Sequence, residues 1–344
     1  MKAVRVHGPC DARLEDIPVR EPEENEVLVK VKSIGLCGTD YDIYTNDLIY
    51  LREGISKLPI VPGHEWSGVI EKAGSCVTKF KPGDKVVGEC TIGCQSCKYC
   101  FSGNYNVCRN REETGIIQKD GAFAEYIVFK EDFLHKFSKM SFDEAALVEP
   151  TAVALYSIMR GDVRPNDNVL VIGPGAIGLL ASQIAKNVYG ARKVILSGTR
   201  AERLDRAKTY GLDGVINVRE EDLKKRVAEI TDGNMIDVVI ETSGSIDIFD
   251  NIKGIINPNG RIVAAGFFSQ NIQMDLDFFI TKNVTITGSI GSPGIWDTVI
   301  ELIEDRKIDV NSIVSHAMRL ENFDKGMDIM VNRKENVCKI IFNP

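Results

Sequence analysis

The sequence has no long apolar run, no excess of positive charge and no low-complexity segment. No hydrophobic stretch approaches the roughly 18–20 residues that a membrane-spanning helix needs, so we expect no membrane anchor. The 42 lysines and arginines are outnumbered by 49 aspartates and glutamates, which gives a formal net charge of −7. Because such a chain suits a phosphate backbone poorly, we expect no nucleic-acid partner. The first residues lead into a strand pattern and carry no export signal, which predicts a cytoplasmic protein.

Nine cysteines are present, and in a reducing compartment they are not expected to form a disulfide framework. Four of them have the spacing C-x2-C-x2-C-x7-C, which suits a closed tetrahedral site of four sulfurs, the usual form of structural zinc. An iron–sulfur cluster and a metal-free group of thiols are the alternatives, and the long last gap without a following proline favours zinc. Cys90, just upstream, is a competitor for the site. The four predicted ligands are Cys94, Cys97, Cys100 and Cys108.

Two regions of different pattern divide the 344 residues, a length typical of about two domains. Short strands broken by glycine and proline fill the first region. From about residue 156, apolar runs alternate with helical stretches, among them a helix expected over 246–256, which predicts a doubly wound parallel sheet. The tail after this sheet is too small to bury its own core and should rejoin the first region. We therefore predict one domain of residues 1–155 together with 292–344, and a second of residues 156–291.

A glycine-rich turn follows the first strand of the second region. It reads Gly173-Pro174-Gly175-Ala176-Ile177-Gly178 and fits G-x-G-x-x-G between a buried strand and a helix. The glycines permit a tight turn and close approach of a pyrophosphate, which sits on the helix N-terminus. The alternative is a glycine-rich turn in a domain that binds no nucleotide. The context favours a dinucleotide held at Gly173, Gly175, Ala176, Ile177 and Gly178.

The end of the next strand of this region indicates the coenzyme. An acidic side chain about 20 residues after the turn normally holds the ribose 2′-hydroxyl of NAD. The chain has Ser197-Gly198-Thr199-Arg200 there, with Gly198 in the acidic position. Nothing at that position repels a 2′-phosphate, and Arg200 is suited to pair with one. We expect NADP to be favoured over NAD, with contacts from Gly198, Thr199 and Arg200; the alternative is a solvated Arg200 and NAD held elsewhere.

Three further segments contain side chains that bind metals. They are Gly35-Leu36-Cys37-Gly38-Thr39-Asp40, Pro62-Gly63-His64-Glu65 and Leu147-Val148-Glu149-Pro150. Each alone has an ordinary structural explanation, as a packed cysteine, a hydrogen-bonded histidine or a helix boundary. Their occurrence together with the cysteine cluster and the nucleotide turn favours a second metal site. His7, His135 and His316 have no such context and are expected to be structural or exposed.

With these motifs the chain resembles the zinc-dependent medium-chain alcohol dehydrogenases, in the branch of sorbitol, threonine and other polyol dehydrogenases. The resemblance covers nearly the whole chain and includes Lys81-Pro82-Gly83-Asp84-Lys85-Val86 and Asp120-Gly121-Ala122-Phe123-Ala124-Glu125-Tyr126. It implies an α/β protein with a GroES-like, mostly-β catalytic domain, completed by the C-terminal tail, and an inserted Rossmann domain. It also implies two zinc ions, one catalytic and one structural.

The reaction needs an open metal site, because zinc acts on the alcohol oxygen while hydride leaves the carbon. Cys37 and His64 are the expected ligands, with Glu65 or Glu149 as the third. We expect Glu149 close to the metal, and Glu65 either as a direct ligand or in exchange with water. Thr39 resembles the hydroxyl that begins the family's proton relay. A histidine often follows three residues later in the family, and this chain has Asp42 there, so Asp42 either carries the proton onward or is a surface residue.

The expected substrate is a secondary alcohol on a polyol, cyclitol or sugar, because a carboxylate at 149 makes the pocket polar. A sugar phosphate and an amino acid such as threonine are the alternatives. Arg52 and Lys57, in a segment expected to form part of the substrate wall, either hold a phosphate or carboxylate or are solvated. Outside this enzyme class, an iron–sulfur electron carrier and a catalytically inactive relative remain as alternatives. The expected assembly is a homodimer or homotetramer.

Overall fold

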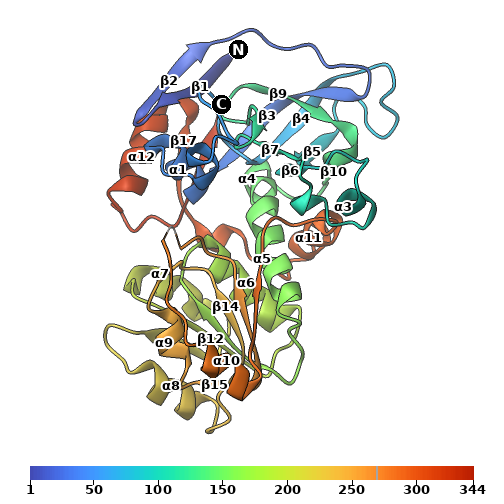
Figure 1. Cartoon of the computed structure of the whole chain (residues 1–344). Helices are drawn as coiled ribbons and strands as arrows, with labels where there is room; N and C mark the ends of the chain where they lie inside the picture. Colours follow the sequence, from blue (N-terminus) through green and yellow to red (C-terminus); the bar gives the residue numbers. More distant parts are fainter. Residues whose placement is uncertain (269) are drawn as a thin grey trace. The chain divides into compact units, whose positions relative to one another are not determined.

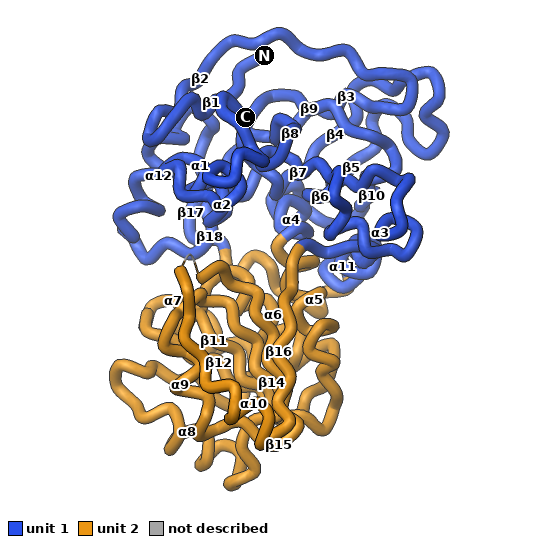
Figure 2. Tube along the Cα trace, viewed as in Figure 1, with its two compact units in different colours: residues 1–149, 291–304, 314–344 blue, residues 150–290, 305–313 orange. Residues whose placement is uncertain are grey.

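The computed structural model describes residues 1–268 and 270–344 (Figure 1). The chain divides into two compact units (Figure 2). Within the described residues, no helix has the length and apolarity required to cross a membrane. Unit 1 consists of Met1–Glu149, Gly291–Glu304 and Val314–Pro344, and unit 2 of Pro150–Ile290 and Asp305–Ile313.

Unit 1 is built on a seven-stranded sheet with the order β10-β5-β4-β3-β18-β17, in which β9 also pairs with β3. Smaller sheets join β1 to β2 and β6 to β7 and β8. The strands are β1 (Lys2–Gly8), β2 (Asp11–Asp16), β3 (Glu26–Leu36), β4 (Glu65–Ala73), β5 (Lys85–Gly88), β6 (Thr91–Ile92), β7 (Glu112–Thr114), β8 (Gln118–Lys119), β9 (Tyr126–Lys130), β10 (Leu134–Lys136), β17 (Val314–Arg319) and β18 (Lys339–Asn343). The helices are α1 (Gly38–Thr45), α2 (Ile49–Arg52), α3 (Lys98–Phe101), α4 (Phe142–Ala146), α11 (Trp296–Glu304) and α12 (Phe323–Val331), with 3-10 turns at Tyr105–Val107, Glu131–Phe133 and Leu320–Asn322.

The C-terminal strand β18 lies inside the sheet of unit 1. It pairs antiparallel with β3, so that Ile340 lies opposite Leu36 and Ile341 opposite Gly35. Its apolar side chains are buried in the core of this unit, where the ring of Phe342 meets that of Phe123 edge to face at 5.6 Å between centroids. Burial of these side chains therefore holds the end of the chain against strands formed by its first hundred residues.

Unit 2 contains a six-stranded, wholly parallel sheet with the order β13-β12-β11-β14-β15-β16. This is the 3-2-1-4-5-6 order of the doubly wound nucleotide-binding fold, which confirms the predicted Rossmann domain. Its strands are β11 (Asn168–Ile172), β12 (Lys193–Gly198), β13 (Gly214–Asn217), β14 (Ile236–Glu241), β15 (Ile256–Ala264) and β16 (Thr285–Gly288). Its helices are α5 (Val148–Arg160), which starts two residues before the unit, α6 (Ala176–Asn187), α7 (Ala201–Arg206), α8 (Leu223–Ile230), α9 (Ile248–Ile252) and α10 (Leu276–Lys282), with 3-10 turns at Ala207–Thr209 and Asn311–Ile313.

Burial explains the central strands of this sheet. All five residues of β11 are buried, as a strand covered by helices on both faces requires. One expected helix is wrong in extent: the helix predicted over 246–256 is only Ile248–Ile252. The reason is strand pairing, since Ile255 accepts a hydrogen bond from the backbone of Ile236 and Ile256 lies opposite Ile236 in the sheet.

Candidate active site and metal centres

The four clustered cysteines converge in unit 1. Their sulfur atoms lie within 4.8 Å of one another, with Sγ–Sγ distances of 3.9 Å for Cys94–Cys100, 3.6 Å for Cys97–Cys100 and 3.7 Å for Cys97–Cys108. Four sulfurs about 2.3 Å from one tetrahedral zinc would lie roughly 3.8 Å apart. The spacing of the thiols therefore fits a zinc ion held by four sulfurs.

The local fold produces this convergence. Cys97 is the N-cap of the single-turn helix α3, Cys100 lies within that helix, and Cys108 follows a 3-10 turn. Hydrogen bonds from Ser96 lower the pKa of Cys94 to about 6, which favours the thiolate that binds metal. Cys90 is outside the group: burial raises its pKa well above the ordinary value, and it packs against an apolar cluster that includes Ile60 and Ile116.

A second group of metal-binding atoms lies in the same unit. One ligand atom each from Cys37, His64 and Glu65 falls within 4.8 Å of the other two. Cys37 follows β3 as the N-cap of α1, and Glu65 opens β4. Because β3 and β4 pair antiparallel with Gly35 opposite Glu65, the sheet brings the two motifs together.

Buried polar groups support this second site. Asp40 is fully buried and accepts hydrogen bonds from the backbone nitrogens of Cys37 at 2.9 Å and Gly63 at 3.1 Å. It therefore ties the two loops together. The Nδ1 atom of His64 is buried without a hydrogen-bond partner, 3.7 Å from Oδ1 of Asp40. An unsatisfied ring nitrogen beside a thiol and two carboxylates fits a site that binds a cation.

Gly35 is required by the packing of the same site. A Cβ atom at this position would overlap Oε2 of Glu65 and lie 3.1 Å from the Cβ of Glu65. The absence of a side chain at 35 thus leaves room for the carboxylate of Glu65. This is a physical reason for the glycine two residues before Cys37 in the sequence motif.

Lys339 neutralises Glu65 in the interior. Its Nζ donates hydrogen bonds to both carboxylate oxygens of Glu65, at 2.6 and 2.7 Å, and to the carbonyl of Leu36 at 3.0 Å. Both side chains are almost fully buried, at 4% and 1% exposure. Burial opposes the charge on Lys339, but the carboxylate of Glu65 and the nearby thiol of Cys37 raise its pKa above the ordinary value.

Glu149 lies near the same group but is not one of its three close members among the described residues. Burial raises its pKa to about 7, while the ring of His64 acts in the opposite direction. Thr39 stands in the first turn of α1, and its Oγ1 is 3.8 Å from the sulfur of Cys37. Asp42, also on α1, is half-buried, and burial together with Asp47 raises its pKa to about 6.

The other candidate side chains have separate surroundings. Arg52 and Lys57 are exposed. His135 is bound on both ring nitrogens, with Nδ1 2.7 Å from Asp297 and Nε2 3.0 Å from Glu89. His7 contacts Glu15 at 2.7 Å, and His316 contacts Glu335 at 3.2 Å. These three histidines therefore bind carboxylates and belong to neither metal group within the described residues.

The glycine-rich turn of unit 2 joins β11 to α6. Gly173 has a φ of +103°, which a side chain would strain, and a Cβ on Gly178 would overlap the carbonyl oxygen of Gly173. Gly175 is the N-cap of α6 and offers no side chain to the first amides of the helix. Those amides and the helix dipole form a site suited to a pyrophosphate, with Ala176 and Ile177 as the first helical residues.

The three residues expected to contact the ribose follow in order at the end of β12. Gly198 is the last residue of the strand and is buried, Thr199 is exposed, and Arg200 is the N-cap of α7. A hollow of about 390 Å³ lies at the carboxyl ends of β15 and β16, where open α/β sheets bind ligands. Sequence reasoning did not identify its lining, which includes Arg160, Ala264–Phe267 and Gly288–Ile290.

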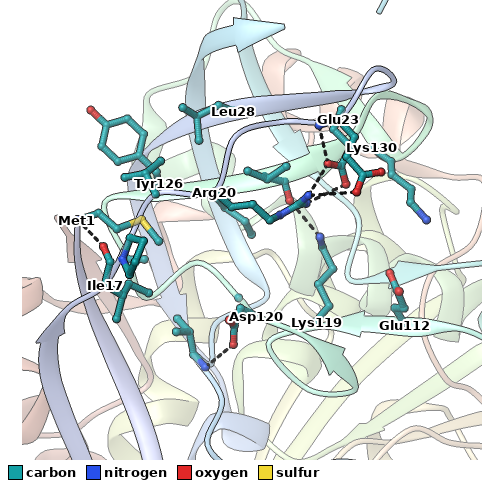
Figure 3. A pocket seen from close by; sticks show the side chains of 18 of the residues that line it. Met1, Ile17, Arg20, Glu23, Leu28, Glu112, Lys119, Asp120, Tyr126 and Lys130 are labelled. Carbon is teal, nitrogen blue, oxygen red and sulfur yellow. Dashed lines mark hydrogen bonds and ion pairs between the residues drawn. The ribbon is translucent and has the colours of Figure 1, made fainter. Parts of the chain in front are cut away.

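Unit 1 has another cavity, of about 460 Å³, shown in Figure 3. Several of its charged side chains are engaged with one another or with the backbone: Arg20 bonds Glu26 at 2.8 Å, and Lys119 donates to the carbonyl of Val128 at 3.0 Å. Asp120 accepts from the amide of Val61 at 2.9 Å. None of the predicted site residues lines this cavity, as far as the described chain shows. It is therefore not the candidate active site.

Sequence reasoning missed two members of the site, Asp40 and Lys339. Asp40 is in the first motif, but the motif alone indicates no role for it. Lys339 carries a signal that could have been used, since a lysine that begins the apolar run Ile340-Ile341-Phe342 must find a buried partner.

Comparisons with known proteins agree with this arrangement. Residues 23–139 match the alcohol dehydrogenase GroES-like domain, and residues 176–305 match the zinc-binding dehydrogenase family. A sorbitol dehydrogenase of Halalkalibacterium halodurans is 33% identical over 98% of this chain and 97% of its own length.

Two solved structures have the same fold over the whole chain. An alcohol dehydrogenase from Escherichia coli CFT073 in complex with NADH has a TM-score of 0.92 and 28% identity, over 100% of this chain and 99% of that one. The galactitol-1-phosphate dehydrogenase of Escherichia coli has a TM-score of 0.90 and 27% identity, over all of both chains. The chain therefore belongs to the zinc-dependent medium-chain alcohol dehydrogenase family, in the branch that contains polyol and threonine dehydrogenases.

Proposed function

We propose that this protein oxidises a secondary alcohol on a polyol, cyclitol or sugar and transfers the hydride to a nicotinamide coenzyme. The observation that carries the proposal is the group of Cys37, His64 and Glu65, whose ligand atoms lie within 4.8 Å of one another beside the ion pair of Glu65 with Lys339. We assign catalysis to unit 1 and nucleotide binding to unit 2. The likeness to sorbitol and galactitol-1-phosphate dehydrogenases supports a polyhydroxylated substrate.

Cys37 and His64, with Glu65 or Glu149, would hold the catalytic zinc. When bound, zinc acts as a Lewis acid that favours ionisation of the alcohol. Asp40 keeps the loops of Cys37 and His64 in place, and the hydrogen bonds from Lys339 hold the carboxylate of Glu65 in position. Thr39 would relay the alcohol proton, accepting it at Oγ1 as its own hydroxyl proton leaves toward Asp42. Asp42, with its pKa raised to about 6, would take up that proton and release it to solvent.

We further propose one structural zinc, held by Cys94, Cys97, Cys100 and Cys108, for a total of two zinc ions per chain. The Sγ–Sγ distances of 3.6 to 3.9 Å support this assignment. Thiol ligands remain reduced in the cytoplasm, where we place the protein.

We propose NADP as the preferred coenzyme, bound with its pyrophosphate on the turn Gly173–Gly178 and its 2′-phosphate toward Arg200. The support is the absence of a side chain at 198, where an acid would bind the 2′-hydroxyl of NAD. A charge-assisted contact is worth roughly 1.5–3 kcal/mol, and solvent screening at Arg200 should reduce the advantage toward about tenfold. The ratio of kcat/KM for the two coenzymes, in wild type and Arg200→Ala, tests this proposal.

We also propose a homo-oligomer, a dimer or a tetramer, joined through the edge of the sheet in unit 2. β16 is the last strand of the order, and apolar side chains near it are exposed, among them Leu276 at 65%, Ile280 at 74% and Ile286 at 39%. An edge strand beside an apolar patch is suited to pairing with a second copy. Sedimentation of wild type and Ile280→Asp tests this interface; a wild-type monomer would contradict it.

A substrate panel tests the main proposal. Sorbitol and other polyols, cyclitols, sugar phosphates and threonine are each supplied with NADP or NAD, and the absorbance of the reduced nicotinamide is followed. We expect turnover with an unphosphorylated polyol, cyclitol or sugar, and none from Cys37→Ser, with the exposed-thiol variant Cys76→Ser as the matched control. Turnover restricted to sugar phosphates or threonine would replace the substrate class, and none at all with zinc-loaded protein would overturn the proposal.

A further inference from the structure

The glycine-rich turn lies directly against Gly198, at the end of β12 that is expected to bind the ribose of the coenzyme. A Cβ atom built on Gly198 would lie 2.6 Å from Cγ of Pro174, with Cδ of the same ring closer still. Carbon atoms in contact are normally about 3.5–4.0 Å apart. The ring of Pro174 therefore occupies the space that any side chain at 198 would need.

Pro174 cannot move away easily. Its ring fixes its own φ, and Gly173, the residue before it, is held by hydrogen bonds to the end of β12 and to the segment after β14. The amide of Gly173 donates to the carbonyl of Ser197 at 2.9 Å, and the hydroxyl of Thr242 donates to the carbonyl of Gly173 at 3.1 Å. A Cβ on Gly173 would itself lie 2.9 Å from Thr242 and Ser243, so the turn is also closely packed against the segment that directly follows β14.

We propose that Pro174 is a specificity-determining residue, which excludes an acidic side chain at 198 and so leaves the ribose end of the site without a carboxylate. The inference rests on the proposed function, because it explains the coenzyme preference of the dehydrogenase. The selection is made by an apolar ring on the glycine turn, and no charge at 174 is involved.

The geometry also shows how the exclusion is removed. Apart from Cδ and Cγ, the nearest atom to the built Cβ is the backbone nitrogen of Pro174 at 3.5 Å, an ordinary contact. Alanine at 174 has neither ring carbon. Pro174→Ala therefore opens the space for a side chain at 198, and Gly198→Asp in that background can place a carboxylate where the ribose 2′-hydroxyl of NAD binds.

A first experiment tests the steric coupling without reference to coenzyme choice. Thermal midpoints are measured for wild type, Gly198→Ala, Pro174→Ala and the double variant. We expect Gly198→Ala to lower the midpoint by several degrees in wild type and by much less in the Pro174→Ala background. Equal effects in the two backgrounds, or no effect in wild type, would overturn the proposal.

A second experiment tests specificity in Pro174→Ala and Pro174→Ala/Gly198→Asp. The ratio of kcat/KM for NAD to that for NADP should rise by about ten- to a hundredfold between these two variants, and the dissociation constants of the coenzymes should change in the same direction. Gly198→Asp alone should bind both coenzymes more weakly than wild type. An unchanged ratio in the double variant would refute the specificity role of Pro174. A wild type that prefers NAD would refute only the proposed NADP preference, because the steric coupling and the change between variants do not depend on which coenzyme the wild type prefers.

Discussion

Replacement of Lys339 by methionine should destabilise unit 1, and most strongly when the open site lacks metal. Methionine keeps much of the apolar stem but removes the ammonium group, and with it the hydrogen bonds to both oxygens of Glu65 and to Leu36. The carboxylate of Glu65, which is 1% exposed, then loses the cationic partner that Lys339 provides. Removal of one member of a buried ion pair costs about 3–5 kcal/mol.

The expected change is large enough to measure by thermal unfolding. For a unit of this size, about 2–4 °C of midpoint is lost per kcal/mol, which predicts a decrease of roughly 6–20 °C after mild chelation. The decrease should be smaller with zinc present, because a divalent cation beside Glu65 replaces part of the lost positive charge. Lys2→Met is the control, since its ion pair with Asp16 is exposed at 49% and 73% and its loss should leave the midpoint nearly unchanged.

A double-variant cycle isolates the ion pair itself. Glu65→Gln with Lys339→Met leaves no unpaired buried charge, so the double variant should recover part of the stability lost by Lys339→Met alone. The reasoning fails if Lys339→Met unfolds at the wild-type temperature after chelation, or if zinc makes no difference to its loss.

Three further predictions concern the metal groups and the half-buried His135. Purified protein should contain close to two zinc ions by elemental analysis, and Cys108→Ser close to one with a lower unfolding midpoint; iron with visible absorption would contradict the zinc assignment. Cys37→Ser and His64→Ala should abolish turnover while the dissociation constant for the coenzyme stays within about twofold, whereas activity near that of Cys76→Ser would remove zinc from the proposed mechanism. Burial opposes the charge on His135, but Glu89 and Asp297 raise its pKa above 6.5, so its contribution to the free energy of unfolding should be complete below pH 6.5 and decline as the pH rises through the folded-state pKa. In urea unfolding between pH 6 and 8, His135→Phe should make the stability less dependent on pH. An unchanged dependence would exclude His135 as its source.

Local motifs predicted much of this protein because their chemistry depends on short spacings. The cysteines at 94, 97, 100 and 108 span one loop, and the structure brings all four sulfurs together. The glycine turn at 173–178 lies between a strand and a helix as expected, and the parallel sheet has the predicted doubly wound order. Such features can be predicted from the sequence because the residues that act together are close in sequence.

Element boundaries and ion-pair partners that depend on distant segments could not be predicted from such local motifs. The helix expected over 246–256 ends at Ile252 because Ile256 begins β15 and pairs with Ile236 of β14. Glu65 has Lys339 as its ion-pair partner, 274 residues away, because β18 inserts beside β3.

The relation between Pro174 and Gly198 shows the same division at the level of single residues. The sequence alone determined that a glycine stands where an acid would bind the ribose of NAD. Only the tertiary structure showed that the ring of Pro174 fills the space beside it. The physical reason is that the spacing of residues within a segment shows which chemical groups that segment contains. Which side chains fit beside those groups depends on close packing between segments that are distant in sequence.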